Sequence, residues 1–477
     1  MADKVEERDV GLAGQISQPI ATPDTKIEVI YGNKDPRHGF VITNSKIIKI
    51  LVHESFFQRL PSMTLVLNDI GTYFHDVGFQ IGNSIFLTIT PDLGGTVDIK
   101  PYIDSEFRIE SIEYGLDQDS NNYCYTIRCT LAAEKYLNDI FVWPKDDSGT
   151  LLNTSKIFSS AEVIRACMTH GGLLCDIMTF PTANDSMAWL NASLCHADFV
   201  DKIVEHAWIS ENDMPILYID KSGTGHYTSL NTLCDAATVS NFIQKSKYQK
   251  LHDETKGIEE NAKPVPYKVY DSLRYVNAGF LQNQGGYGIK TKIFDPRNEA
   301  GINPIDFPVM VTKIIPTTLK KPSINELCFR SKEFHDTGKD NKLRLGVISN
   351  KSQTQLENIR YNTVATHFIE THEHYDYAPM HHASIKRAFY QQFVFMTIDT
   401  SFQPFVDPNG NPIILLGQRV SVDPASVNNQ QTINAGDFLV VGLTHTFYTG
   451  RKYTIMASCV SDGINGIGEV KQSKNTQ

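Results

Sequence analysis

The sequence lacks the features that mark several common classes of protein. Its eight cysteines, spread over 477 residues, form no Cys-x-x-Cys pair, which argues against a zinc site built on that motif. Its longest apolar runs, such as 438–443, are far shorter than the roughly 20 residues of a membrane-spanning helix. The first nine residues are charged and do not resemble a secretory signal. We expect a soluble protein with buried thiols that folds in a reducing cytoplasm.

An excess of basic residues is also missing. Lys plus Arg number 44 against 54 Asp plus Glu, which gives a formal net charge of −10. A protein that grips nucleic acid through its phosphates needs the opposite balance. Loose passage of DNA through a like-charged opening stays compatible with this composition, because tight binding would hinder such passage.

Motifs of catalysis and of nucleotide binding are absent as well. The chain contains no Gly-x-Ser-x-Gly elbow. Its glycine-rich segment 284–288 lacks both Gly-x-Gly-x-x-Gly and Gly-Lys-Ser/Thr, so a hairpin tip is the favoured interpretation. The carboxylate pairs at 146–147 and 259–260 lie in charge-rich loops, where carboxylates are usually solvated. We therefore expect no enzyme, no catalytic residue, no cofactor and no metal.

One histidine-rich segment offers an alternative to that expectation. Between positions 367 and 382 the chain places His367, His372, His374, His381 and His382 beside two glutamates. Imidazole and carboxylate are zinc and iron ligands, but the helical His-Glu-x-x-His motif is absent. A strand would put only two of these histidines on one face. The favoured interpretation is a polar segment that joins two domains, with a metal centre as the alternative.

What the sequence does contain indicates a folded, multidomain, β-rich protein. Hydrophobic residues make up 41% and charged residues 21%, and the length exceeds that of one hydrophobic core. We predict five strands near the amino terminus, at 46–52, 63–67, 85–89, 107–114 and 123–131. This spacing is typical of a barrel or a sandwich.

The middle of the chain has a different, α+β character. Ser159 and Glu162 form a capping-box pattern ahead of an apolar helical face that begins at Val163, and Gly171-Gly172 should end this helix. A second helix is predicted around 199–207. A hairpin follows, with strands at 215–219 and 225–230 joined across 222–224.

The most informative feature is a pattern that occurs twice. A glycine and a strand are followed by Phe-x-β-x-x-β, where β is a branched aliphatic residue or Leu, and then by a turn and Tyr-Thr-Ile. The two copies are Gly82, 85–89, 107–112 and 125–127, and Gly417, 419–422, 438–443 and 453–455. Alternating apolar strands are common in all-β proteins, so part of the match is generic. We predict two similar barrels that superpose, as separated domains rather than one continuous sandwich.

The predicted fold class is therefore a β-rich multidomain (α+β) protein with two similar small β-barrels and an intervening α/β domain. The predicted domains are a flexible arm at 1–25, the first barrel at 26–145, the α/β domain at 146–262, a strand of the second barrel at 263–280, a connecting or spike-proximal domain at 281–390, the second barrel at 391–462 and a flexible tail at 463–477.

In this order of elements the chain resembles the central baseplate hub protein of contractile-tailed (myovirus) phages, which is related to the amino-terminal hub part of type VI secretion VgrG spikes. Segments 61–69, 82–85 and 107–112 carry the first part of the resemblance. Segments 436–447 and 453–457 carry the closing pair of strands, with aliphatic residues before a His or Tyr turn. The helices around Val163 and Phe199 stand where that family has its α/β domain. The resemblance spans roughly 45–461, with little identity.

The resemblance implies a ring-like homotrimer that adapts a three-fold spike to a six-fold tail tube and lines the channel for genome passage. The implied partners are a spike protein, the tail tube or a tube-initiator ring, baseplate wedge proteins and non-specifically passing phage DNA, without a membrane anchor. The implied location is the virion tail baseplate, assembled in the bacterial host cytoplasm. Nothing after Ser461 resembles a needle or a lysozyme, so we expect a separate spike polypeptide.

Two other functions remain as alternatives at this point. The first is a tail-associated, metal-dependent cell-wall hydrolase with its metal at 367–382. The second is a carbohydrate- or receptor-binding tail protein that presents aromatic residues from its strands.

Overall fold

The computed structural model describes residues 24–69, 77–92, 100–116, 123–145, 158–177, 185, 189–209, 213–235, 240–244, 265–269, 274–275, 288–294, 305–310, 343–347, 382, 386, 392–399, 412, 414–424, 436–448 and 452–461. Every structural statement below concerns these residues. The predicted flexible segments up to residue 23 and from 463 onward lie outside them, as do the carboxylate pairs at 146–147 and 259–260.

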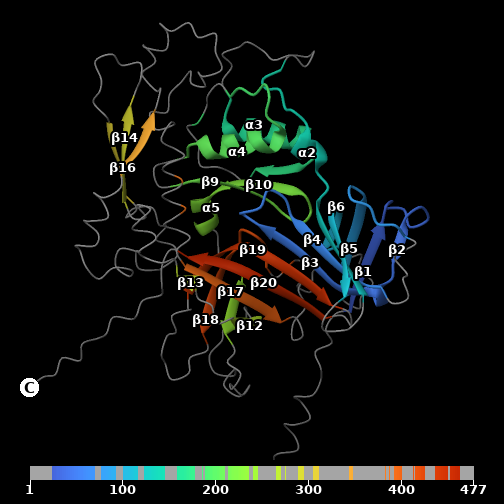
Figure 1. Ribbon diagram of the computed structural model, residues 1–477. Helices are drawn as coiled ribbons and strands as arrows, with labels where there is room; N and C mark the ends of the chain where they lie inside the picture. The colour runs from blue at the N-terminus through green and yellow to red at the C-terminus, as the bar shows by residue number, and fades with distance from the viewer. Residues whose placement is uncertain are drawn as a thin grey trace, which may run out of the picture.

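The amino-terminal module is a curled antiparallel sheet (Figure 1). It consists of β1 (Asp24–Tyr31), β2 (Phe40–Ile42), β3 (Ile47–Ser55), β4 (Ser62–Asn68), β5 (Ser84–Asp92), β6 (Ile103–Leu116) and β7 (Tyr123–Leu131), with a 3-10 turn, η1 (Asn44–Lys46), before β3. The strand order is β2-β1-β5-β6-β7-β4-β3. In β4 every second residue is buried, and Met63, Leu65 and Leu67 enter the core as the period of two requires.

The carboxy-terminal module contains the other seven strands of the large sheet. They are β11 (Ser240–Gln244), β12 (Val265–Val269), β13 (Arg274–Tyr275), β17 (Gln392–Asp399), β18 (Arg419–Pro424), β19 (Gly436–Tyr448) and β20 (Lys452–Ser461). Six of them pair in a closed circuit, β11-β18-β19-β20-β17-β12 and back to β11. β11 is parallel to both of its neighbours, and the other pairs are antiparallel.

The two modules are continuous with each other. β3 of the first pairs antiparallel with β19 of the second, from Ser55 opposite Gly442 to Lys49 opposite Tyr448. We call this pairing the seam. One fourteen-stranded sheet therefore runs through both modules.

The repeated pattern corresponds to a repeated three-stranded unit, β5-β6-β7 in the first module and β18-β19-β20 in the second. The amide of Gly82 donates to the carbonyl of Ile109 at 2.9 Å, and the amide of Gly417 donates to the carbonyl of Val440 at 2.9 Å. Both glycines have positive φ, +88° and +79°, which their turns require. Equivalent backbone hydrogen bonds therefore join the glycine turn to the middle strand in both copies.

The Phe-x-β-x-x-β spacing records a β-bulge in each copy. The register between β6 and β7 shifts between Ile109 and Ser111, and the register between β19 and β20 shifts between Val440 and Gly442. One extra residue in the same place re-aims both strands in the same way. Because Phe107 and Phe438 precede the bulge by the same distance and are both fully buried, the repeat is structural at this level.

The shared Tyr-Thr-Ile tripeptide, by contrast, is out of register. Tyr125 lies opposite Tyr114, whereas the residue in the same place of the second copy is Ile455, opposite His445. The partner of Tyr453 in the repeat is therefore Tyr123. A displacement of two residues keeps every side chain on its own face of the strand, so the two tripeptides share the same alternation of buried and exposed positions.

A middle block of helices and a small sheet lies between the modules in sequence. It contains α2 (Glu134–Asn138), α3 (Ser160–His170), β8 (Leu174–Ile177), α4 (His196–His206), β9 (Pro215–Ile219), β10 (Thr224–Ser229) and α5 (Leu230–Asp235), with strand order β8-β10-β9. The capping box of Ser159 and Glu162 is confirmed, and α3 ends at Gly171. In Figure 1, α2, α3 and α4 cover the side of the small sheet that faces away from the large one.

A third sheet stands apart from the rest in Figure 1, within the region predicted as a connecting domain. It consists of β14 (Gly288–Phe294), β15 (Ile305–Met310) and β16 (Leu343–Val347), in the order β15-β14-β16. Most of the glycine-rich segment 284–288 lies outside the described residues. None of the described helices is long and apolar enough to cross a membrane.

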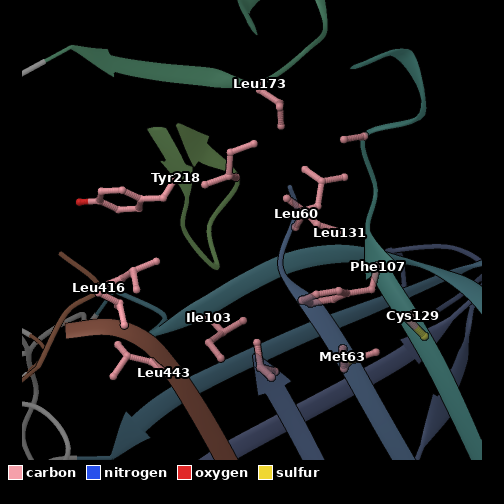
Figure 2. Close-up of a cluster of buried hydrophobic side chains, with 14 of the residues drawn as sticks. Leu60, Met63, Ile103, Phe107, Cys129, Leu131, Leu173, Tyr218, Leu416 and Leu443 are labelled. Atoms are coloured by element: carbon pink, nitrogen blue, oxygen red, sulfur yellow. The ribbon is translucent and has the colours of Figure 1, made fainter. Parts of the chain in front are cut away.

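One hydrophobic core joins the two modules and the middle block. Figure 2 shows Met63 and Phe107 of the amino-terminal module near Leu173 and Tyr218 of the middle block and Leu443 of the carboxy-terminal module. All these side chains are buried. The three parts consequently pack as one body around the seam.

Candidate functional site: the buried junction at the seam

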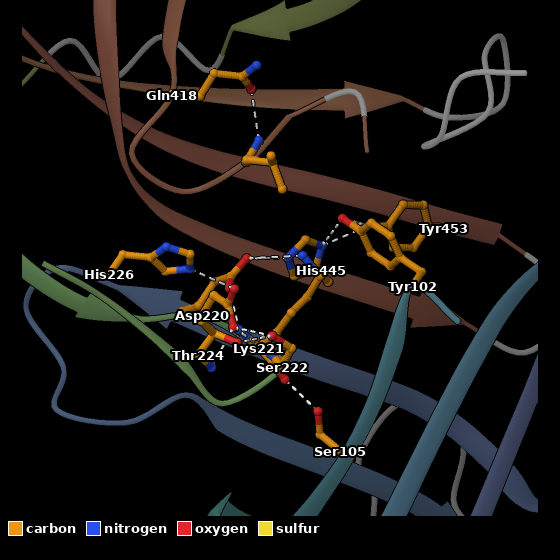
Figure 3. Close-up of polar contacts among 12 residues, drawn as sticks. Tyr102, Ser105, Asp220, Lys221, Ser222, Thr224, His226, Gln418, His445 and Tyr453 are labelled. Atoms are coloured by element: carbon orange, nitrogen blue, oxygen red, sulfur yellow. Dashed lines mark hydrogen bonds and ion pairs between the residues drawn. The ribbon is translucent and has the colours of Figure 1, made fainter. Parts of the chain in front are cut away.

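A cluster of polar side chains lies buried where the three parts meet. Its members are Glu54, Tyr102, Lys221, His445 and Tyr453, none more than 8% exposed. Glu54 belongs to β3, Lys221 to the turn between β9 and β10, and His445 and Tyr453 to β19 and β20. We call this cluster the junction (Figure 3).

Glu54 is the centre of the junction. Its Oε1 lies 3.1 Å from His445 Nε2 and 3.7 Å from Lys221 Nζ. Its Oε2 accepts the backbone amide of Lys221 at 2.7 Å. The two oxygens of one carboxylate thus contact two nitrogens of Lys221 in the middle block and one nitrogen of His445 in the carboxy-terminal module.

Lys221 reaches this position because its turn is rigid. Asp220 Oδ1 accepts the amides of Ser222 at 2.9 Å and Thr224 at 3.1 Å, and Gly223 supplies the positive φ of +81°. This confirms the predicted hairpin across 222–224. The Lys221 carbonyl accepts the hydroxyl of Ser105, so the turn is also held by the amino-terminal module.

Aromatic groups complete the surroundings of the charges. Lys221 Nζ lies 4.4 Å from the ring centroid of Tyr102, a cation–π contact. The hydroxyl of Tyr453 lies 2.7 Å from His445 Nδ1, and the hydroxyl of Tyr102 lies 3.4 Å from the same atom. Figure 3 shows both tyrosines against the His445 ring, on the side away from the lysine turn.

The charges of the junction balance each other. Burial alone raises the pKa of Glu54, but the positive charge of Lys221 and the hydrogen bond from His445 outweigh burial and hold that pKa below its usual value. Burial likewise opposes the charge of Lys221, yet Glu54 raises its pKa above the ordinary range. Glu54 and Lys221 are therefore a buried ion pair.

His445 is neutral in this environment. Burial lowers its pKa, and Lys221 lowers it further, against the opposing effect of Glu54. A carboxylate can only accept, so Nε2–H donates to Glu54 and Nδ1 accepts the hydroxyl proton of Tyr453. This assignment satisfies both ring nitrogens.

The arrangement positions modules rather than substrates. A glutamate, a histidine and a lysine within bonding distance form a set that enzymes use, but here His445 is 0% and Glu54 1% exposed, so no substrate atom reaches them. A buried ion pair gains little stability over an apolar contact, yet leaving one charge alone is costly. The junction therefore permits one arrangement of the three parts and penalises others.

The stability of the protein is expected to fall as the pH is lowered from 7 to 4.5. Burial lowers the pKa of His53 and His445 and lowers that of His206 to about 4. Below about pH 6.5 the unfolded chain binds protons there that the folded chain does not, costing about 1.4 kcal/mol per pH unit for each proton of difference. The contribution of Glu54, whose pKa is depressed, is present above its unfolded pKa and is lost as the pH falls through the folded one.

Melting temperatures at pH 7.5, 6.5, 5.5 and 4.5 test this dependence. A His206→Gln variant should show a shallower slope below pH 6.5, because it removes one of the protons that favour unfolding. Equal melting temperatures at all four pH values would contradict it.

Sequence reasoning did not single out the central residues of this site. Glu54 ends an apolar strand, and Lys221 lies in a turn, where lysine is usually solvated. His445 was among the residues that carried the family resemblance, but at an expected turn. The structure places it inside β19 instead.

The histidine-rich segment contributes a single described residue. His382 is buried and its ring stacks on Trp208 at 6.3 Å between centroids, while 367–381 lie outside the described residues. Among the residues that the structure describes, no three His, Cys, Asp or Glu side chains are placed to hold a metal ion.

Comparison with known proteins gives matches in structure alone. No family model and no curated protein sequence matches this chain. The fold is similar to that of a tail protein from Neisseria meningitidis MC58, with a TM-score of 0.50 and 9% identity over 92% of this chain and 98% of that one. At this identity the match shows a shared fold.

Two further solved structures have lower scores. The 43 kDa tail protein of prophage MuSo2 from Shewanella oneidensis gives a TM-score of 0.49 at 11% identity, covering 92% of this chain and all of that chain. A chain of the lidded Francisella PdpA-VgrG complex gives 0.43 at 11% identity, covering 95% of this chain and 54% of that chain. The predicted resemblance is confirmed at the level of the fold by the tail protein from Neisseria meningitidis MC58.

Proposed function

We propose that this protein is the structural hub subunit of a phage tail baseplate. Three copies form a ring to which each contributes its two modules as two similar barrels, with the middle block as the intervening domain. Six similar positions around the ring meet a six-fold tail tube, and the trimer itself meets a three-fold spike. The opening passes phage DNA without binding it tightly.

The observation that carries this proposal is the duplicated unit with the same bulge and the same glycine bonds in both modules. A duplicated module in a cyclic trimer is the simplest route to approximate six-fold symmetry. The shared fold with a tail protein and the acidic net charge of −10 support the same assignment. The junction suits it too, because a ring needs its two modules at one fixed angle.

The remaining parts of the proposal follow the order of the chain. The third sheet, β14-β15-β16, belongs to a spike-proximal or connecting domain at 281–390. Wedge proteins and the tail tube or a tube-initiator ring contact the outside and top of the hub. The protein is located in the virion tail and assembles in the bacterial cytoplasm, as a structural component without catalytic activity or membrane anchor.

The mass of the purified protein tests the trimer. Mass photometry of the full chain, alone and co-expressed with the spike protein of the same tail, is expected to give a particle of three times 53.5 kDa for the hub. Negative-stain images should show a ring with an opening on its axis. A chain that remains monomeric both alone and with the spike protein contradicts the proposal.

A further inference from the structure

Among the described residues, one edge of β6 has no strand partner along its second half. β5 pairs with β6 only up to Arg108, and the last bonds on that side join Ile109 to the Asn83 carbonyl and to the Gly82 amide, each at 2.9 Å. From Ser111 to Leu116 the same side of β6 has no strand partner among the described residues. Unpaired backbone donors and acceptors along such an edge are a template for another strand.

The repeat shows what covers the same edge in the other copy. β18 pairs with the start of β19, as β5 does with β6. Beyond the bulge, β3 then covers β19 from Gly442 to Tyr448 in the seam. Ser111–Leu116 in β6 corresponds to Gly442–Phe447 in β19, so within the described part of the chain the first copy has no strand in the place that β3 occupies in the second copy.

The aromatic side chains beside the two edges differ in exposure: they are buried where the edge is covered and exposed where it is not. In the second copy, His445 and Tyr453 are buried under the seam, at 0% and 3% exposure, with rings stacked at 6.2 Å. Their counterparts in the first copy, Tyr114 and Tyr123, are stacked at 5.3 Å but are 49% and 54% exposed. Two large rings left in water beside an open strand edge indicate a surface that another protein covers.

The strand that would cover this edge is also given by the repeat. β3 pairs with β4, which pairs with β7, and in the second module β12 and β13 pair with β17, which pairs with β20. His53 lies opposite Ser62 in the first module, and Arg274 lies opposite Phe393 in the second. β13 is therefore the counterpart of the end of β3, and it is the last strand of the large sheet.

We propose that the Ser111–Leu116 edge of β6 is the docking site for β13 of a second copy of this chain, in an antiparallel register that places Glu113 opposite Arg274. This inference rests on the trimeric hub proposed above. The seam then recurs between subunits: β3 covers β19 within a chain, and β13 covers β6 of the next chain. Such a head-to-tail contact generates a closed ring when the rotation between successive copies closes after three subunits.

The proposed register between β6 and β13 can be compared with the pairing of β3 and β19 in the seam. In the seam the equivalent residues are His53 and Thr444, whose side chains are joined at 2.9 Å. The Phe56 amide donates to the Val441 carbonyl at 3.0 Å, which makes the pair of residues 53 and 444 one of the closer, non-hydrogen-bonded kind, with Cα atoms about 4.5 Å apart. The intersubunit pair replaces that hydrogen bond with residues of opposite charge.

A cross-link tests the register directly. The full-length variant Glu113→Cys with Arg274→Cys, assembled as for mass photometry and then oxidised, should give a trimer on a denaturing gel that a reductant returns to monomer. The Cα separation of that pair suits a disulfide. The single variants and the off-register variant Glu113→Cys with Lys268→Cys should stay monomeric on the same gel.

A charge exchange gives an independent reading. In the single chain Glu113 pairs with Arg128 at 2.7 Å, with both side chains more than half exposed. Because such an exposed pair adds little stability, Glu113→Arg should leave the melting temperature within a few degrees of the parent, but it should reduce the trimer fraction at least tenfold. Adding Arg274→Glu should restore the trimer.

The outcomes separate this inference from the proposed function. A trimer in mass photometry without the cross-link overturns the β6–β13 pairing and leaves the hub. A disulfide that forms only within single chains, and never between them, contradicts a second copy as the occupant of the β6 edge. A monomer with and without the spike protein overturns both.

Discussion

Replacing Glu54 with glutamine is expected to lower the free energy of unfolding by about 3–5 kcal/mol. The variant keeps the shape of the side chain but leaves the Lys221 ammonium buried without a counter-charge, and it alters the acceptor of the His445 hydrogen bond. The three parts that meet at the junction should loosen together. Urea denaturation followed by tryptophan fluorescence measures the loss.

A matched ion pair on the surface provides the control. Lys34 and Asp104 are joined at 3.1 Å, with side chains 63% and 44% exposed. Asp104→Asn should therefore cost no more than about 1 kcal/mol. The double variant Glu54→Gln with Lys221→Met should recover part of the loss, because it removes both charges. If Glu54→Gln costs as little as Asp104→Asn, Glu54 and Lys221 do not form an ion pair.

Replacing Phe438 with aspartate is expected to prevent folding of the carboxy-terminal module. Phe438 is fully buried in β19, and losing its packing costs about 3–5 kcal/mol. An unpaired carboxylate in the same place adds several kcal/mol, so the total is comparable to the roughly 5–15 kcal/mol that stabilises a whole domain. Yield of soluble protein and protection from proteolysis report the result.

The counterpart and the control of Phe438→Asp lie in the same repeat. Phe107→Asp should be as damaging, since Phe107 is equally buried at the same point before the bulge. Met456→Asp, on a strand position that is 37% exposed, should fold. A folded Phe438→Asp protein that only loses a ligand would instead favour the receptor-binding alternative.

Local features of the fold could be predicted from the sequence because they depend on neighbouring residues. The helix cap at Ser159, the hairpin after Ile219 and the glycines at positive φ each follow from a few adjacent side chains. The Phe-x-β-x-x-β spacing also indicated the bulge. A regular strand alternates with a period of two, and the two consecutive x positions break that alternation where the extra residue lies. The exact register of β20 could not be found, because a shift of two residues leaves the pattern unchanged.

The junction could not be predicted, for a different physical reason. Glu54 and His445 are 391 residues apart in sequence, and nothing in a strand's composition states which edge it will meet. Lys221 looks like any turn lysine until its backbone amide is seen to donate to Glu54. Buried charges are recognised only when their partners are placed.

The pairing of β3 with β19 also has a consequence for biosynthesis. β3 ends at Ser55, whereas β19, the strand that covers its edge, begins only at Gly436. Of the strands in the large sheet, β19 is the second-to-last to leave the ribosome. At about 5–20 residues per second, the edge of β3 waits roughly 20–80 s for its partner. A bare edge strand invites association between nascent chains, and an ionised side chain on it opposes such association. Glu54 places a carboxylate on this strand, and Lys221 and His445, which enclose it in the folded protein, are both made later.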